Sequence, residues 1–263
     1  ALSGDGYYFY TPMRHRRKSL WTMRRLFAML RKLTGARAER ISISHLHGKT
    51  VGLLHLPPGA EDLSPRSLPA LVALHPLGGD KDSFDYFLGQ FRAMRYATFC
   101  VDLPAHGENY DGPRLKPDAE CVGAAALEKL AAHPAIDPNR LGVIGGSMGG
   151  FFALRTAAAS PLAKACLAFA APFDMGARAH QMVPGIVDSF AWVVGAATLA
   201  EAHAHVQRFH LRDALGNIRC PVGIVHGTQD HICDFTATYA IASRITAPVS
   251  VFPLVGADHE RKL

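Results

Sequence analysis

Short apolar runs, separated by stretches with helical periodicity, make up most of this chain. Residues 41–47 alternate apolar and polar side chains, and a Gly-containing turn leads to a second apolar run at 51–56. This pattern predicts a β-hairpin. Continuous apolar runs follow, which are typical of parallel strands buried on both faces. They comprise residues 70–74, 96–101, 141–144, 165–170, 222–225 and 249–252.

Helical stretches lie between these runs. Residues 84–94, 119–132 and 148–159 read as helices. Strands that alternate with helices predict a mostly parallel, doubly wound sheet with helices on both faces. The hairpin would add antiparallel strands at one edge of that sheet. We therefore expect an α/β fold.

The segment from 173 to 218 is too long for a simple crossover between two strands. It is rich in apolar residues and predicts about two extra helices. Apolar helices need a surface to cover, and the open carboxyl ends of the strands offer one. We interpret this insertion as a cap over an active site.

The N-terminal region carries an unusual charge pattern. Residues 14–32 hold eight Lys and Arg side chains and no Asp or Glu. An apolar stripe runs through the same segment, with Lys18, Arg24, Arg25, Arg31 and Lys32 off it. The stripe consists of Leu20, Met23, Leu26, Phe27, Leu30 and Leu33. We predict a basic helix within an extension at 1–38, ahead of a domain at 39–263. The helix either packs on the domain or a dimer partner, or lies on an anionic membrane surface.

Composition narrows the class of protein. The 263 residues are 49% hydrophobic and 19% charged, which suits one globular enzyme domain. The net charge is +6, and the chain without its eight N-terminal cations carries −2, so the basic character is local. A nucleic-acid enzyme more often spreads its basic patch over the fold, so we expect no nucleic-acid partner.

The five cysteines are widely spaced, with no CxxC pair, and indicate neither a zinc site nor a disulfide framework. We expect no metal and no cofactor. No apolar stretch reaches 18 residues and no signal-peptide pattern is present, so we expect a cytoplasmic protein.

The segment Gly145-Gly-Ser147-Met-Gly149 joins the apolar run at 141–144 to the predicted helix at 148–159. A catalytic serine needs a sharp strand-to-helix turn that projects its hydroxyl above the sheet, with small residues two positions before and after it. A dinucleotide fingerprint has a different glycine spacing, and a Walker loop has a lysine that is missing here. We predict Ser147 as the nucleophile.

A serine hydroxyl needs a histidine base and a carboxylate that orients the base. On such an elbow the acid and then the histidine follow in chain order, each after a strand. Asp230 follows the run at 222–225, and His259 follows the run at 249–252. We predict these two as acid and base, with Asp174 as the main rival for the acid. His226 and His231 are too near the acid in sequence to be the base.

The reaction also needs hydrogen-bond donors for the oxyanion, each worth about 10²–10³ in rate. We predict the backbone N–H of Met148, next to the nucleophile, and that of Leu77 in the loop after the run at 70–74. The candidate substrate-binding residues are His75, His106, Phe190 and Trp192.

Five segments in order resemble the α/β-hydrolase superfamily, most closely its dienelactone-hydrolase, prolyl-oligopeptidase-like and carboxylesterase branches. They are HPLGG at 75–79, DLPAHG at 102–107, DPNRLGVIGGSMGG at 137–150, HGTQD at 226–230 and GADH at 256–259. The resemblance covers about residues 40–260. It implies that the first segment is the oxyanion loop and that the last two carry the acid and the histidine. It is unspecific for the substrate, because this fold hosts many chemistries.

A serine nucleophile indicates acyl chemistry, and an apolar cap indicates a hydrophobic or aromatic small-molecule substrate. Hydrolysis of a carboxylic ester, or of a thioester, is our first hypothesis. An acyltransferase with the same triad is the second, and hydrolysis of a C–C bond is the third. A non-catalytic binding protein on this fold remains the alternative from a different class.

Overall fold

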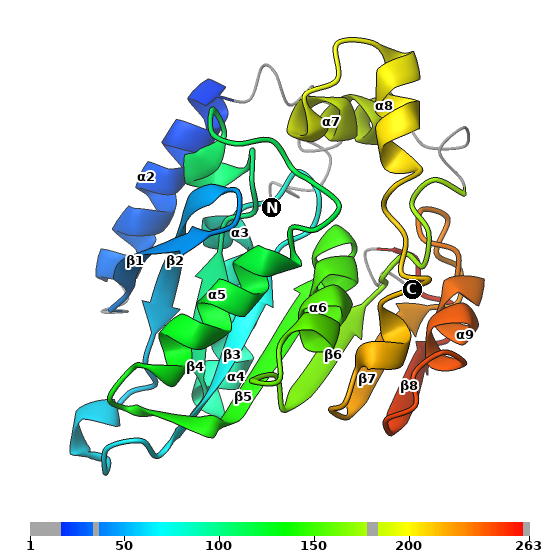
Figure 1. The fold of residues 1–263 in the computed structure, drawn as a ribbon. Coiled ribbons are helices and arrows are strands. Elements are labelled where there is room, and N and C mark those ends of the chain that lie inside the picture. Colours follow the sequence, from blue (N-terminus) through cyan, green and yellow to red (C-terminus); the bar gives the residue numbers. More distant parts are fainter. Residues whose placement is uncertain (1–16, 34–36, 178–183, 260–263) are drawn as a thin grey trace.

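The computed structural model describes residues 17–33, 37–177 and 184–259. Its centre is a mixed sheet of eight strands in the order β1-β2-β4-β3-β5-β6-β7-β8 (Figure 1). The strands are β1 (Glu39–His45), β2 (Gly48–His55), β3 (Leu68–Leu74), β4 (Ala97–Val101), β5 (Ile136–Gly146), β6 (Ala165–Phe169), β7 (Val222–Gly227) and β8 (Val249–Leu254). Strand β2 pairs antiparallel with both β1 and β4. Every other pairing in the sheet is parallel. The predicted fold is confirmed.

Helices cover both faces of the sheet, as the apolar runs required. The helices of at least five residues are α2 (Arg17–Leu33), α3 (Lys81–Asp85), α4 (Gly89–Ala93), α5 (Glu120–Ala131), α6 (Met148–Ala159), α7 (Pro184–Val194), α8 (Leu199–Val206) and α9 (Thr236–Ala242). In Figure 1, α5 and α6 lie in front of the sheet and α4 lies behind it. Ala73, Cys100 and Ile144 pack with Leu88 in a smaller apolar cluster, separate from the main core that includes α5 and α6.

The predicted helix at 84–94 is wrong in detail. It is three short pieces, in which a 3₁₀ turn, η3 (Tyr86–Leu88), separates α3 from α4. The first piece starts earlier than predicted because of a capping box. The Asp80 side chain accepts a hydrogen bond from the Ser83 backbone N–H, and the Ser83 hydroxyl accepts one from the Asp80 backbone N–H. Such a capping box stabilises a helix start wherever it occurs, so it overrides a weak apolar period. Helix α9 was not predicted, and it matters for the site.

Helix α2 lies against the domain through ion pairs and one buried leucine. Arg24 and Arg31 form ion pairs with Glu108 and Asp82, at 3.1 Å and 2.9 Å. Leu20 is buried on the same face, whereas Leu26 and Leu33 are 47% and 73% exposed. The sequence interpretation placed five cations of this helix off the apolar stripe, away from the packing face, and for Arg24 and Arg31 that is wrong. Contact of the outer face with a membrane or a second copy stays a prediction.

The acids that receive α2 belong to a buried ionic cluster. Lys81 Nζ lies 2.8 Å from Asp82, 3.2 Å from Asp102 and 3.0 Å from Glu108. Arg40 on β1 also binds Glu108. Helix α3 and the loop after β4 share this cluster, so its ion pairs hold these two segments together. The loop after β3 leads directly into α3.

The cap is built by α7 and α8, within the predicted 173–218 insertion. In Figure 1 these two helices are drawn in yellow and lie above one end of the sheet. Ile186, Phe190, Val193 and Val194 of α7 are buried, as predicted for an apolar cap. In the described part of the chain no single helix is long and apolar enough to span a membrane, although α7 and α8, bent by 79°, reach that length and composition together.

Candidate active site

The turn between β5 and α6 holds Ser147 in a rare backbone conformation, with φ 53° and ψ −120°. Such a conformation is strained for a residue with a side chain and occurs where function requires it. A Cβ atom at Gly145 would overlap the carbonyl oxygen of Gly149, and a Cβ at Gly149 would overlap that of Leu74. Both glycines are therefore needed for the turn to close, as the sequence analysis expected.

Two loops at the end of the sheet bring the acid and the histidine together. The Gln229 N–H donates to the Ala257 carbonyl, and the Gly256 N–H donates to the Thr228 hydroxyl, both at 2.9 Å. A side chain at Gly227 would overlap the carbonyl oxygens of Ala257 and Asp258. This glycine in the HGTQD segment is what lets the histidine loop approach so closely.

Ser147, His259 and Asp230 form one hydrogen-bonded chain. His259 Nε2 lies 3.1 Å from Ser147 Oγ, and His259 Nδ1 lies 2.7 Å from Asp230 Oδ2. Since a carboxylate can only accept, Nδ1 carries the hydrogen and Nε2 is left to accept from the serine hydroxyl. The three predicted residues, taken from distant parts of the chain, are thus within reach of one another.

Asp230 and His259 each stabilise the charged form of the other. Burial alone would raise the pKa of Asp230, but hydrogen bonds from His226 and His259 hold that pKa well below its usual range. Burial lowers the pKa of His259, yet the Cys233 sulfur and the Asp230 carboxylate outweigh it and raise the pKa. An imidazolium beside Asp230 is therefore stabilised, which is what a base needs when it takes a proton from a serine.

The loop after β3 makes a tight turn beside Ser147. The Gly79 N–H donates to the Pro76 carbonyl at 3.0 Å, and Gly78 has φ 77°, as in a type II turn. Leu77 at the tip of this turn lines the same cavity as Ser147 and Met148. Met148 begins α6, where backbone N–H groups have no partner within the helix. Both residues border the cavity beside Ser147, and their role as oxyanion donors stays a prediction.

His75 and His106 lie outside the lining of the cavity beside Ser147, which therefore gives no support to their predicted contact with substrate. Both are fully buried, with their rings 4.8 Å apart. His75 Nε2 accepts from the Leu103 N–H at 2.9 Å, and His106 Nε2 accepts from the Gly78 N–H at 3.4 Å. Burial lowers the pKa of His75 to about 4, so it stays neutral. His106 thus holds the turn at Gly78, and His75 holds the loop after β4 at Leu103.

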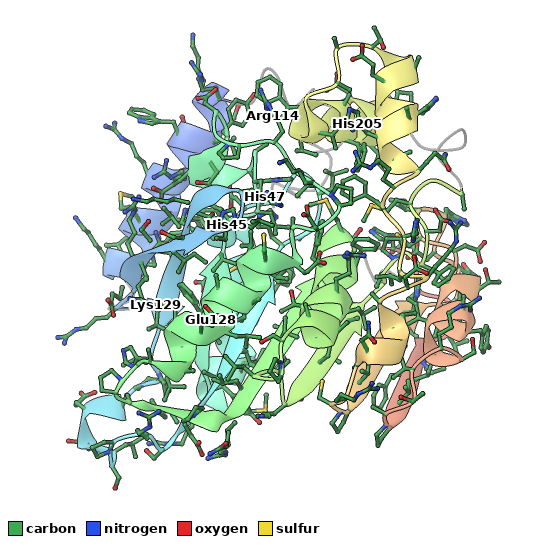
Figure 2. All side chains as sticks on the ribbon, in the orientation of Figure 1. His45, His47, Arg114, Glu128, Lys129 and His205 are labelled. Atoms are coloured by element: carbon green, nitrogen blue, oxygen red, sulfur yellow. The ribbon has the colours of Figure 1, made fainter. Side chains whose placement is uncertain are left out.

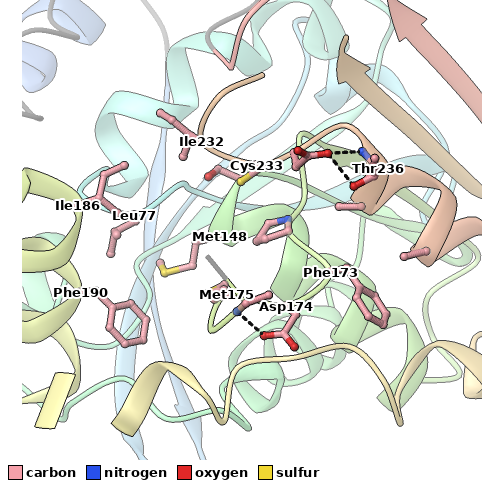
Figure 3. A pocket seen from close by; sticks show the side chains of 16 residues that line it. Leu77, Met148, Phe173, Asp174, Met175, Ile186, Phe190, Ile232, Cys233 and Thr236 are labelled. Atoms are coloured by element: carbon pink, nitrogen blue, oxygen red, sulfur yellow. Dashed lines mark hydrogen bonds between the residues drawn. The ribbon is translucent and has the colours of Figure 1, made fainter. Parts of the chain in front are cut away.

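A cavity of about 310 Å³ opens beside Ser147, under the cap. Figure 3 shows Leu77, Met148 and Phe190 around it, together with Ile232 and Cys233. Its other large apolar side chains are Phe173, Met175 and Ile186. The prediction that Phe190 lines the substrate pocket agrees with this arrangement.

Trp192 lies outside the lining of this cavity, which therefore gives no support to its predicted contact with substrate. Its ring stacks on Tyr110 at 4.7 Å, and the Arg114 guanidinium lies 4.5 Å from its centre. Figure 2 shows Arg114 beside one end of α7. Trp192 and Phe190 are two positions apart on α7 and point to different sides. Trp192 therefore anchors the cap to the loop after β4.

Asp174, the rival acid, lies at the pocket but not in the hydrogen-bonded chain. Its carboxylate pairs with Arg212 and accepts from the N–H groups of Gly176 and Ala177. Among the described residues, no group of three His, Cys, Asp or Glu side chains is arranged to hold a metal ion.

One residue near the site was set aside by the sequence analysis. His226 was excluded as a base because of its closeness to Asp230 in the sequence, and it is His259 whose imidazole lies within hydrogen-bond distance of Ser147. His226 nevertheless lies 3.1 Å from Asp230 Oδ2. Its spacing of four residues from the acid was the signal that could have suggested a contact.

Comparison with known proteins agrees with this geometry. A sequence model of the alpha/beta hydrolase family matches residues 71–261. The chain is 34% identical over 142 residues to 2,6-dihydropseudooxynicotine hydrolase of Paenarthrobacter nicotinovorans, which covers 54% of this chain and 38% of that protein. It is 32% identical over 145 residues to the esterase FrsA of Vibrio cholerae, covering 54% of this chain and 33% of the esterase. The chain thus spans less than half the length of these two relatives.

Solved structures show the same fold over most of the chain. The crystal structure of 2,6-dihydroxy-pseudo-oxynicotine hydrolase superposes with a TM-score of 0.83 at 26% identity, covering 93% of this chain and 68% of that one. An acetyl xylan esterase from Paenibacillus sp. R4 superposes with a TM-score of 0.67 at 18% identity, covering 90% and 89%. At that lower identity the likeness speaks for the fold alone.

Proposed function

Because the chain belongs to the α/β-hydrolase family, we propose that it is a serine hydrolase that cleaves a carboxylic ester, or a thioester, of a hydrophobic or aromatic substrate. The observation that carries this proposal is the hydrogen-bonded chain from Ser147 through His259 to Asp230. It supports nucleophilic catalysis because each atom has the partner that the reaction needs.

In this mechanism the Ser147 oxygen attacks the acyl carbon while its proton passes to His259 Nε2. Asp230 stabilises the imidazolium that forms. The backbone N–H groups of Leu77 and Met148 would receive the oxyanion. His259 then gives the proton to the departing alcohol, which leaves an acyl group on Ser147. A water molecule, deprotonated by His259, releases the acid and restores the hydroxyl.

The apolar cavity supports the choice of substrate. Its walls are mostly aliphatic and aromatic side chains, so an acyl group gains affinity there by leaving water. Each buried methylene contributes about 0.8 kcal/mol, or about 4-fold in binding, until the cavity is full. We expect kcat/KM for p-nitrophenyl esters to rise from acetyl to a medium acyl chain and then to fall. A flat or steadily falling series would count against an acyl pocket in this cavity.

A fluorophosphonate probe tests the nucleophile directly. We expect the wild type to be labelled and Ser147→Ala to lose all labelling, whereas Ser243→Ala, which changes an exposed serine, should be labelled normally. Absence of labelling in the wild type would favour a non-catalytic binding protein. Labelling that survives Ser147→Ala would place the nucleophile elsewhere.

Product analysis separates the related reactions. With an added alcohol, a hydrolase gives mainly the free acid, while an acyltransferase gives mainly the new ester. A β-diketone substrate that is cleaved faster than every ester would indicate hydrolysis of a C–C bond instead.

A further inference from the structure

The acid of the proposed triad is held by two imidazoles at one oxygen. Asp230 Oδ2 lies 2.7 Å from His259 Nδ1 and 3.1 Å from His226 Nε2. Its other oxygen, Oδ1, accepts from the backbone N–H groups of Ile232 and Cys233, at 2.8 Å and 2.7 Å. Four donors therefore surround a carboxylate whose side chain is fully buried.

The position of the hydrogen on His226 follows from its neighbours. Nε2 faces Asp230 Oδ2 and, at 2.8 Å, the Cys233 carbonyl oxygen. Both of these atoms can only accept, so Nε2 must carry a hydrogen and donate it. This hydrogen bond favours the charged form of Asp230 and ties the carboxylate to the strand β7, which carries His226.

The opposite nitrogen of His226 is held by α9. Nδ1 lies 2.8 Å from the hydroxyl of Thr238, which is fully buried. A hydroxyl can donate to Nδ1, which keeps the Nε2 hydrogen on the side of Asp230. The ring is also flanked edge-on by Phe235, with centroids 5.6 Å apart. Rotation of the imidazole would break all of these contacts.

We propose that His226 is a positioning residue that, held by Thr238, aims Asp230 Oδ2 at His259 and fixes the carboxylate in the direction needed to orient the base. It acts through Asp230 and touches no reacting atom. Its role in turnover rests on the proposed function, because an oriented Asp230 matters only if His259 serves as a base for Ser147. At metal sites, groups that orient a ligand by hydrogen bonding commonly contribute about 10- to 100-fold to affinity or activity, and we expect an effect of that order here.

The test compares variants that keep or remove one donor. His226→Gln can place an amide N–H where Nε2 was, whereas His226→Leu removes the donor at similar size. Thr238→Val removes the hydroxyl with its shape kept, and Thr238→Ser retains it. We expect kcat to fall about 10- to 100-fold in His226→Leu with KM little changed, and to recover largely in His226→Gln. Thr238→Val should lose a few-fold and Thr238→Ser almost nothing.

A second measurement separates positioning from a general loss of structure. The proton NMR resonance of the His259–Asp230 hydrogen bond, recorded on the resting full chain, should shift or broaden in His226→Leu and return in His226→Gln. Activities are compared well below each variant's unfolding temperature, so that the folded fraction is the same.

Three results would overturn this role for His226. The first is that His226→Leu keeps the wild-type kcat and the wild-type resonance. The second is that His226→Gln is no more active than His226→Leu. The third is a loss of kcat that only follows the unfolded fraction.

The NMR readout needs no substrate. If the wild type fails to react with the fluorophosphonate, the proposed function falls while the hydrogen-bond coupling can still be judged from the resonance.

Discussion

Helix α2 and the cap are both amphipathic, yet they pack on the domain by different means. In α7 the apolar side chains turn inward, and Phe190 contacts Phe209 with ring centroids 5.1 Å apart. In α2 Arg24 and Arg31 turn inward to carboxylates beside the buried Leu20, while Leu26, Met29 and Leu33 remain exposed. An apolar stripe shows that a helix has two faces, but the surface opposite decides which face is packed.

The surfaces that receive the two helices explain the difference. The cap lies over the mostly apolar cavity beside Ser147, so most of its contacts there are hydrophobic. Helix α2 meets Asp82 and Glu108, two acids of the Lys81 cluster. With Lys81 as the cluster's buried cation, these carboxylates need further positive charge, and Arg24 and Arg31 supply it. The comparison predicts that the two helices respond differently to substitution, pH and salt.

The largest effect is expected in the cap. Phe190→Ala should lower the free energy of unfolding by about 3 kcal/mol, because it removes a buried ring and leaves a cavity against Phe209. Denaturant unfolding measures this, with the exposed Leu199→Ala of α8 as control, for which we expect a change within about 0.5 kcal/mol. Equal effects of the two substitutions would mean that the cap is not held by apolar packing.

A smaller effect, dependent on pH, is expected where α2 packs. Three cations, Lys81, Arg24 and Arg40, bind Glu108, and although its burial opposes the shift, they lower its pKa to about 2. A carboxyl with a lowered pKa stabilises the fold above its unfolded pKa, near 4.5, and this contribution is lost as the pH falls through 2. Glu108→Gln should therefore cost about 2 kcal/mol at pH 6.

The same substitution provides its own check. The difference in unfolding free energy between the wild type and Glu108→Gln should shrink as the pH is lowered from about 4.5 toward 2, since the wild-type side chain then becomes neutral too. Urea unfolding at several pH values would show this. A difference that stays constant with pH would exclude charge as the way in which α2 is held.

The smallest effect is expected on the outer face of α2. Leu26→Ser and Leu33→Ser should each change the unfolding free energy by less than about 0.5 kcal/mol, because both side chains are largely exposed. A loss as large as that of Phe190→Ala would show that this face is packed in solution. Co-sedimentation of these variants and the wild type with anionic vesicles tests the membrane prediction, which equal behaviour of all three would end.

Local pattern was enough for the core of the fold and for the three residues of the hydrogen-bonded chain. Continuous apolar runs identified the strands, because a strand buried on both faces admits few polar residues. Ser147 was recognisable because its strained turn requires glycines on both sides, and Asp230 and His259 because they follow strands in the expected order. The broken helix at 81–93 was missed, since capping by Asp80 competes with a weak apolar period.

What remained undecided was the direction in which side chains point. His75 and His106 occur in loops that border the site, and only the folded chain shows that their rings turn inward to backbone donors. Trp192 and Phe190 are two residues apart on one helix and face different surroundings. The contact of His226 with Asp230 also depends on α9, which brings Thr238 to the far side of the ring. Sequence determines which residues and elements are available, because burial and backbone strain restrict residue types locally. Tertiary structure alone decides their partners, because those partners lie on segments far away along the chain.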